Sequence, residues 1–110
     1  MKRIYIAGPM TGLPELNFPA FHHAASILRA SGYTAVNPAE INPDPNAQWQ
    51  ACMFRDLEEL DKCDAILMLH GWENSPGAQI ERLWAKRTGK TVLAPTMLGC
   101  IESLLNEATE

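Results

Sequence analysis

Residues 64–70, DAILMLH, are the stretch that decides the fold. Between Asp64 and His70, five apolar residues follow one another without a polar break. A half-buried strand alternates apolar and polar residues, whereas a strand of a parallel sheet is covered on both faces and is apolar throughout. The stretch therefore predicts a strand of a parallel sheet, with helices on both sides of it.

Short apolar runs occur at three other places, and a helical pattern separates each run from the next. The further predicted strands are residues 3–8, 33–37 and 91–94, and the predicted helices are residues 18–31, 47–62, 77–88 and 99–108. Residues 37–46, NPAEINPDPN, are rich in proline and predict a loop. Alternating strands and helices indicate an α/β fold with a parallel sheet. We expect a flavodoxin-like, three-layer α/β/α fold with roughly four or five strands, in which the order 2-1-3-4 makes the first and third strands neighbours.

The composition is that of a globular protein, and we expect one domain over residues 1–110. Apolar residues make up 46% and charged residues 20% of the chain, which is ordinary for such a domain. The net charge of −4 argues against a nucleic-acid polymer as partner. No apolar run approaches the roughly 18 residues of a membrane span, and no signal-peptide pattern is present, so we expect a cytoplasmic protein. The three cysteines lack metal-ligand spacing, which predicts reduced thiols, no metal site and no cofactor.

Two loops are the places where we expect a ligand, because they follow the first and third strands. Right-handed crossovers put such loops outside the carboxyl ends of the strands, where α/β sheets bind ligands. Asp64 lies at the opposite edge of the sheet, where it is expected to close a turn. The first loop matches neither GxGxxG nor GxxxxGK[ST], yet its small residues suit a phosphate or a sugar edge. It consists of Gly8, Pro9, Met10, Thr11 and Gly12.

The second loop ends in Ser75, Pro76 and Gly77, directly before a predicted helix. Free N–H groups and a partial positive charge at a helix N-terminus suit an anion. Ser75 also fits a plain N-cap, with Pro76 at the first helical position. The two interpretations are compatible, and we predict that Ser75 and Gly77 contribute to substrate binding.

Three side chains are candidates for chemistry, and each also has a purely structural interpretation. Glu81 lies one turn inside the helix that follows the second loop, within reach of the crevice, or it is a surface carboxylate. Asp56 lies on the helix before the third strand, or it shares a solvated face with Glu59 and Lys62. Tyr5 points to the opposite sheet face from its strand neighbours, and a tyrosine in a strand is usually a core residue.

Three segments taken together resemble a known family. They are YIAGPMTG (residues 5–12), RDLEELDKCDAI (residues 55–66) and SPGAQIE (residues 75–81). In this order they resemble the nucleoside 2-deoxyribosyltransferase superfamily, which includes the deoxynucleoside 5′-monophosphate N-glycosidases. The opening segment is most similar to that of an uncharacterised, phage-associated group. The resemblance covers about residues 3–90 and rests on the ordered set rather than on any single motif.

The resemblance implies a role for each candidate residue. Glu81 matches the catalytic glutamate, and Tyr5 matches the tyrosine whose hydroxyl contacts that carboxylate. Asp56 matches the acid that holds or protonates the leaving base. Ser75 stands where the nucleoside transferases have an aspartate that binds the sugar 5′-hydroxyl. A serine beside Gly77 at a helix start accepts a 5′-phosphate better than an aspartate does, which favours nucleotides.

The implied activity is cleavage or transfer of the N-glycosidic bond of 2′-deoxynucleotides, through an oxocarbenium-like transition state. A non-catalytic nucleotide-binding or sensing protein stays open as an alternative. So does a hydrolase of another N-ribosyl bond, such as that of NAD. Two departures from the family bear on this choice: the first loop lacks the arginine of the glycosidases, and the segment after the fourth strand is short. The resemblance also implies a homodimer or larger homo-oligomer, in which a neighbouring subunit completes the pocket.

Overall fold

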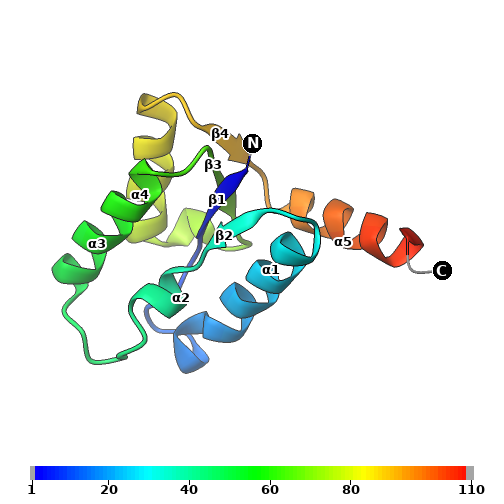
Figure 1. Cartoon of the computed structure of the whole chain (residues 1–110). Helices are drawn as coiled ribbons and strands as arrows, with labels where there is room; N and C mark the ends of the chain where they lie inside the picture. The colour runs from blue at the N-terminus through cyan, green and yellow to red at the C-terminus, as the bar shows by residue number, and fades with distance from the viewer. Residues whose placement is uncertain (1, 109–110) are drawn as a thin grey trace.

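A four-stranded parallel sheet in the order β2-β1-β3-β4 forms the centre of the fold. The structure is a computed structural model, and it describes residues 2–108. The strands are β1 (Arg3–Ala7), β2 (Thr34–Val36), β3 (Ala65–Met68) and β4 (Thr91–Leu93). The first strand pairs in parallel with both the second and the third. The flavodoxin-like α/β/α fold predicted from DAILMLH and its neighbours is thereby confirmed, including the order that makes the first and third strands adjacent (Figure 1).

The helices follow the strands in alternation, with short extra turns in two connections. They are α1 (Phe18–Ala30), α2 (Pro38–Ile41), α3 (Trp49–Asp61), α4 (Pro76–Arg87) and α5 (Thr96–Ala108), and the 3-10 turns are η1 (Pro14–Asn17) and η2 (Trp72–Asn74). The prediction of a loop over residues 37–46 is wrong in part, because α2 lies within it. The Asn37 side chain accepts a hydrogen bond from the Ala39 N–H, and Pro38 occupies the first turn, so cap and proline together start a helix. The last helix also begins earlier than the predicted residue 99.

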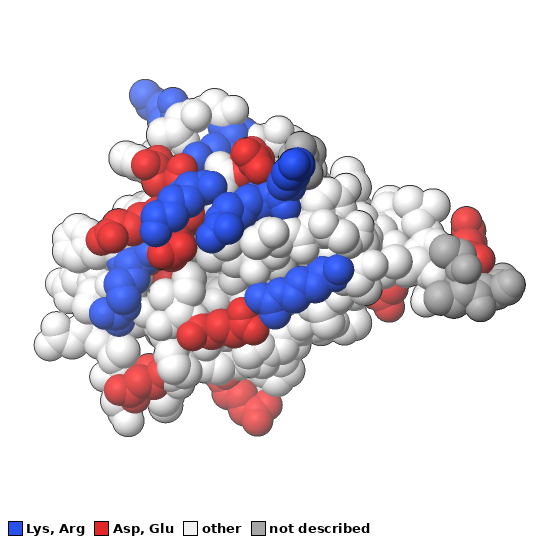
Figure 2. Space-filling model, in the orientation of Figure 1, with Lys and Arg blue, Asp and Glu red and all other residues white. Residues whose placement is uncertain are grey.

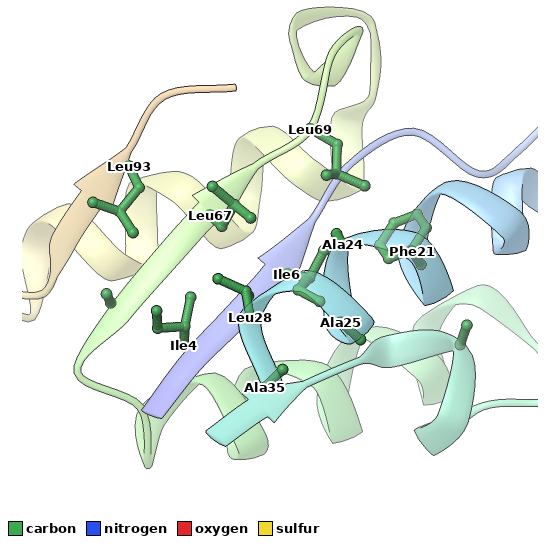
Figure 3. Close-up of a cluster of buried hydrophobic side chains, with 12 residues drawn as sticks. Ile4, Ile6, Phe21, Ala24, Ala25, Leu28, Ala35, Leu67, Leu69 and Leu93 are labelled. Carbon is green, nitrogen blue, oxygen red and sulfur yellow. The ribbon is translucent and has the colours of Figure 1, made fainter. Parts of the chain in front are cut away.

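One face of the sheet is covered by α1 and α5. Figure 3 shows Ile4, Ile6 and Leu67 of the strands pointing toward Phe21 and Leu28 of α1. Each of these five side chains is at most 1% exposed. Burying an aliphatic side chain of this size stabilises a fold by roughly 1.5–3 kcal/mol, so this cluster fixes α1 on the sheet. The start of α5 joins the cluster, while its end extends away from the body of the molecule (Figure 1).

The other face of the sheet is covered by α3 and α4. Its core contains Tyr5 and Ile66 of the strands, Leu60 of α3, and Ala78 and Ala85 of α4. Tyr5 thus lies on the face opposite Ile4 and Ile6, as the alternation along the strand predicts. Small alanines on α4 allow the helix to approach the sheet closely, and this brings polar side chains of α3 and α4 near the tyrosine.

Asp64 fixes the end of the sheet that lies away from the ligand crevice. Its Oδ2 accepts hydrogen bonds from the backbone N–H groups of Lys2 and Arg3, each at 3.0 Å. These two donors lower the pKa of the carboxyl. Asp64 lies at the predicted edge of the sheet, but its carboxylate joins the start of β1 to the start of β3 and does not close its own turn.

The charged side chains are mixed in sign on the face of the molecule in view. Figure 2 shows Lys and Arg side chains interspersed with Asp and Glu over the region of α3 and α4. Elsewhere, Arg29 of α1 and Glu40 of α2 form an ion pair, in which nitrogen and oxygen lie 2.6 Å apart. Among residues 2–108, no helix is long and apolar enough to cross a membrane.

Candidate functional site

A cavity of about 270 Å³ lies at the carboxyl ends of β1 and β3, between the first loop, the segment around α2, and helices α3 and α4. Its apolar wall comes from the first loop, α1 and α3, and includes Met10, Phe18, Phe21, Met53 and Trp49. Its polar end contains Asn42, Asp56, Ser75 and Glu81. An apolar wall facing a few convergent polar groups is the common form of a small-molecule site.

Glu81 lines this cavity and contacts Tyr5, which lies behind it and is not itself a lining residue. The Tyr5 hydroxyl donates a hydrogen bond to Glu81 Oε2 at 2.5 Å. The tyrosine is 0% exposed and the glutamate 5% exposed. A glutamate so deeply buried is rare unless it is paired, so the interpretation of Glu81 as a surface carboxylate is wrong. The strand supplies the tyrosine from below, and the second turn of α4 supplies the carboxylate from the side.

Asp56 lies beside this pair, on the inward face of α3. It is 8% exposed, and its Oδ1 accepts a hydrogen bond from Asn42 Nδ2 at 2.8 Å. The predicted alternative, a solvated face shared with Glu59 and Lys62, is therefore wrong for Asp56. Glu59 and Lys62 instead form an ion pair with each other at 3.2 Å on the outside of the helix.

Burial and mutual repulsion raise the pKa of both carboxyls. Loss of solvation, followed by the charge of Asp56, raises the pKa of Glu81 to about 8. Loss of solvation raises the pKa of Asp56 to about 6, against the hydrogen bonds that it receives. The pKa of Tyr5 is raised well above its ordinary value, by burial first and by the two carboxylates second. Tyr5 therefore stays a neutral hydrogen-bond donor.

The two carboxyls titrate as a pair that holds one proton over the neutral range. Between about pH 6 and about pH 8, the order of the two pKa values places the charge mainly on Asp56 and the proton mainly on Glu81. The Tyr5 hydroxyl stabilises negative charge on Glu81, and the Asn42 amide stabilises it on Asp56. The site thus offers a carboxylate and a carboxylic acid side by side, which is the combination that general acid chemistry next to a nucleophile or cation stabiliser needs.

Ser75 and Gly77 line the cavity at the start of α4. The Ser75 hydroxyl accepts a hydrogen bond from the Ala78 N–H at 3.2 Å, so the N-cap interpretation is confirmed. The hydroxyl keeps its own proton for donation to a ligand. A Cβ added at Gly77 would lie 3.4 Å from Met53 Sδ and 3.8 Å from Trp49 Nε1, so the start of α4 packs closely against α3 here.

The predicted residues of the first loop divide into two groups. Gly8, Met10 and Thr11 line the cavity. Pro9 instead lines a separate, shallower hollow that His70 also borders, and Gly12 is among the lining residues of neither. Gly12 has a φ of +83°, which glycine adopts readily.

Gly8 is required by close packing between the two loops. An added Cβ would lie 2.8 Å from Leu69 Cβ, a distance that forces a shift of one backbone or the other. The glycine therefore allows the end of β1 to lie against the segment after β3. This contact brings the first loop alongside the start of α4.

A run of three left-handed residues closes the loop side of the cavity. Glu15, Leu16 and Asn17 have φ values of 54°, 53° and 59°. Each such residue without glycine costs roughly 1–2 kcal/mol in a regular left-handed turn. The strained run is held by Asn17 Nδ2, which donates to the Pro9 carbonyl at 3.0 Å, and it places Leu16 in the cavity wall.

Two groups of cavity residues were not predicted from the sequence. Asn42 lies in the segment interpreted as a loop, although the Asn-Pro pair at residues 37–38 is a recognisable helix start. Part of the apolar wall was also missed, because Phe18, Phe21 and Met53 read as ordinary core positions of a helix. Among the described residues, no cluster of His, Cys, Asp or Glu could hold a metal ion.

Comparisons with known proteins agree with this architecture. A family model described as Domain of unknown function (DUF4406) matches residues 2–94. Among solved structures, a 2-deoxyribosyltransferase from Leishmania mexicana superposes with a TM-score of 0.66 at 20% sequence identity. The match covers 86% of this chain and 63% of that chain, so the present chain spans less than two thirds of its length. No curated protein matches the sequence.

Proposed function

The chain belongs to the family described as Domain of unknown function (DUF4406), and from this premise we propose that it cleaves or transfers the N-glycosidic bond of 2′-deoxynucleotides. The observation that carries the proposal is the buried constellation of Tyr5, Glu81 and Asp56 at the end of a 270 Å³ cavity. The fold shared with a 2-deoxyribosyltransferase supports a glycosyl-transfer chemistry. A merely structural carboxyl pair would not need an open cavity beside it.

In the proposed reaction, Glu81 acts at the anomeric carbon and Asp56 at the base. The reactive form of the free pair carries the charge on Glu81 and the proton on Asp56. It is the minor form, because the pKa of Glu81 lies above that of Asp56. A Glu81 oxygen bonds to C1′ while the C1′–N bond breaks, and the bonding electrons leave with the base. Asp56 gives its proton to the departing base, which becomes neutral. Water or a second base then attacks C1′, Asp56 recovers the proton, and the Glu81–C1′ bond breaks. In every step, the 2.5 Å hydrogen bond from Tyr5 positions Glu81.

The proposed 5′ end of the substrate lies at the start of α4 and along the first loop. Two hydroxyls, those of Ser75 and Thr11, line this part of the cavity, and Gly8 and Gly77 present small surfaces beside them. Together with the N-terminus of α4 they suit a 5′-phosphate. The base would lie against the apolar wall, where Trp49 is 49% exposed and available for stacking.

A second candidate substrate class is the unphosphorylated 2′-deoxynucleoside. Among the described residues, the charged side chains that line the cavity are Asp44, Asp56 and Glu81. Carboxylates repel a phosphate dianion, and no lysine or arginine among residues 2–108 lines the cavity to offset them. This charge pattern favours a substrate with an uncharged 5′ end.

We also propose that the chain self-associates into a homodimer or larger homo-oligomer. Large apolar side chains on α3, α4 and α5 are exposed: Phe54 is 70%, Leu83 55% and Leu104 64% exposed. Contiguous apolar patches mark protein–protein contacts. Phe54 and Leu83 are on α3 and α4, which pack side by side, whereas Leu104 is on α5, which packs on α1. Light scattering coupled to size-exclusion chromatography measures the mass directly, and a mass of one chain at all concentrations would contradict the proposal.

The experiment that tests the function is a substrate panel read by chromatography of the released base. It includes 2′-deoxynucleosides, their 5′-monophosphates, the corresponding ribonucleotides and NAD, each with and without a second free base. We expect release from the 2′-deoxy 5′-monophosphates, or from the deoxynucleosides if the carboxylate-lined cavity excludes phosphate. Thermal stabilisation by these ligands without any release would favour a non-catalytic binding protein.

A further inference from the structure

Asn42 stands between two charged groups and touches both. Its Nδ2 donates to Asp56 Oδ1 at 2.8 Å, and its Oδ1 accepts from Arg55 Nε at 2.7 Å. The chemistry of the partners fixes which way the amide points. A carboxylate accepts and a guanidinium donates, so the reversed amide would set oxygen against carboxylate and N–H against N–H.

The backbone around Asn42 gives the amide a defined place. Asn42 is the C-cap of α2, and its N–H donates to the Pro38 carbonyl at 2.9 Å. The side chain reaches from this cap across to α3, where Arg55 and Asp56 are consecutive residues. Asn42 also lines the cavity, beside the carboxyl that it contacts.

We infer that Asn42 is a positioning residue for Asp56: its amide, oriented by Arg55, holds Asp56 Oδ1 and leaves Oδ2 as the oxygen that carries the proton to the base. An acid proton on Oδ1 would compete with the amide donor, so the proton is left to Oδ2. Glu81 and Tyr5 are the other side chains within hydrogen-bonding reach of the Asp56 carboxyl. This inference rests on the proposed function for its catalytic meaning. The hold on Asp56 itself is testable without any activity.

The charged and titratable groups around Asp56 come from every element that packs against it. Tyr5 approaches from β1, Glu81 from α4, Arg55 from its own helix, and Asp44 lines the same cavity from the loop before α3. Asn42 acts against the burial that disfavours the ionised form of Asp56, because its N–H and the Arg55 charge behind it both stabilise the carboxylate. An acid whose conjugate base is stabilised in place gives up its proton more readily near neutral pH.

The test follows the Asp56 carboxyl carbon by ¹³C NMR titration in protein labelled at aspartate, with the signal assigned through Asp56→Asn. In Asn42→Leu, the bulk remains and the donor is lost, so we expect the Asp56 titration to move to higher pH by about one unit. The acidic limb of the pH profile for base release should move with it, and kcat/KM should fall about tenfold. Asn46→Leu, in the same loop, should leave titration and rate unchanged.

A second variant separates positioning of Asp56 from simple support of the loop. Asn42→Asp keeps an acceptor for Arg55 and loses the donor to Asp56, so it should raise the Asp56 titration at least as much as Asn42→Leu. If the Asp56 titration stays at its wild-type value in both variants while circular dichroism shows them folded, the inference is wrong. If wild-type protein releases no base from any substrate, the proposed function fails, and the NMR titration still decides whether Asn42 holds Asp56.

Discussion

Replacing Glu81 with glutamine should make the protein more stable at alkaline pH while removing its proposed catalytic group. The glutamine keeps the shape of the side chain, an oxygen for the Tyr5 hydroxyl, and an N–H that can face Asp56. It removes the need to ionise a carboxyl that is 5% exposed. In the wild type, that ionisation is opposed first by burial and then by the charge of Asp56.

The magnitude follows from the pKa of Glu81, which burial raises from 4.5 to about 8. A raised acid pKa means that the folded protein binds a proton that the unfolded chain has already lost over this pH range. The resulting stabilisation is fully present below about pH 4.5 and is lost as the pH rises through about 8. At 1.36 kcal/mol per pKa unit, the loss is on the order of 3–5 kcal/mol. Because the glutamine cannot ionise, it does not suffer this loss.

The assay is urea denaturation of wild type and Glu81→Gln at pH 5 and at pH 9. Near pH 5 the two proteins should have free energies of unfolding within about 1 kcal/mol, since both carry a neutral side chain there. Near pH 9 the variant should be more stable by about 2–4 kcal/mol. The exposed carboxyl of Glu58 on α3 provides the control, and Glu58→Gln should change little at either pH. A variant that gains nothing between pH 5 and pH 9 would refute the burial argument for Glu81.

Three further substitutions test the geometry of the site. Tyr5→Phe removes the hydroxyl that donates to Glu81 at 2.5 Å. A hydrogen bond to a charged group is worth about 1.5–3 kcal/mol, so its loss should lower kcat/KM by about 10–100-fold. The alkaline pKa of the pH–rate profile should also move upward. Gly8→Ala places a Cβ 2.8 Å from Leu69 Cβ and should cost about 1–3 kcal/mol in thermal denaturation, and an unchanged Tm would show that the two loops do not touch. Glu15→Gly relieves a residue at a φ of 54° and should gain about 1 kcal/mol, whereas Glu15→Ala should gain nothing.

Much of the fold could be predicted because its signals are local and redundant. The apolar run around Ile66 and Leu67 requires cover on both faces, and the helical patterns on either side supply that cover. Strand alternation alone places Tyr5 on the face opposite Ile4. The helix α2 was missed because proline-rich composition outweighed the Asn-Pro cap at residues 37–38, which depends on a hydrogen bond from one side chain.

The chemistry of the site could be predicted less completely, because its decisive facts are distances between distant segments. The spacing of Glu81 on its helix was compatible with a surface position, and only packing of α4 on the sheet shows it to be buried against Tyr5. The first loop was predicted to bind as a unit, yet Gly8, Met10 and Thr11 line the cavity and Pro9 and Gly12 do not. Asn42 carries no local motif, since its partners are defined by the fold.

The most direct test of the central claim is release of free base, with wild type and Glu81→Gln compared side by side at pH 7. The substrate is the best 2′-deoxynucleotide or 2′-deoxynucleoside of the panel, and the product is quantified by chromatography. If Glu81, Asp56 and Tyr5 act as proposed, the wild type releases base measurably. The rate of the variant is then lower by about 1,000-fold or more. Equal rates for the two proteins, or no release by the wild type from any substrate, would contradict the proposed catalytic role of this carboxyl pair.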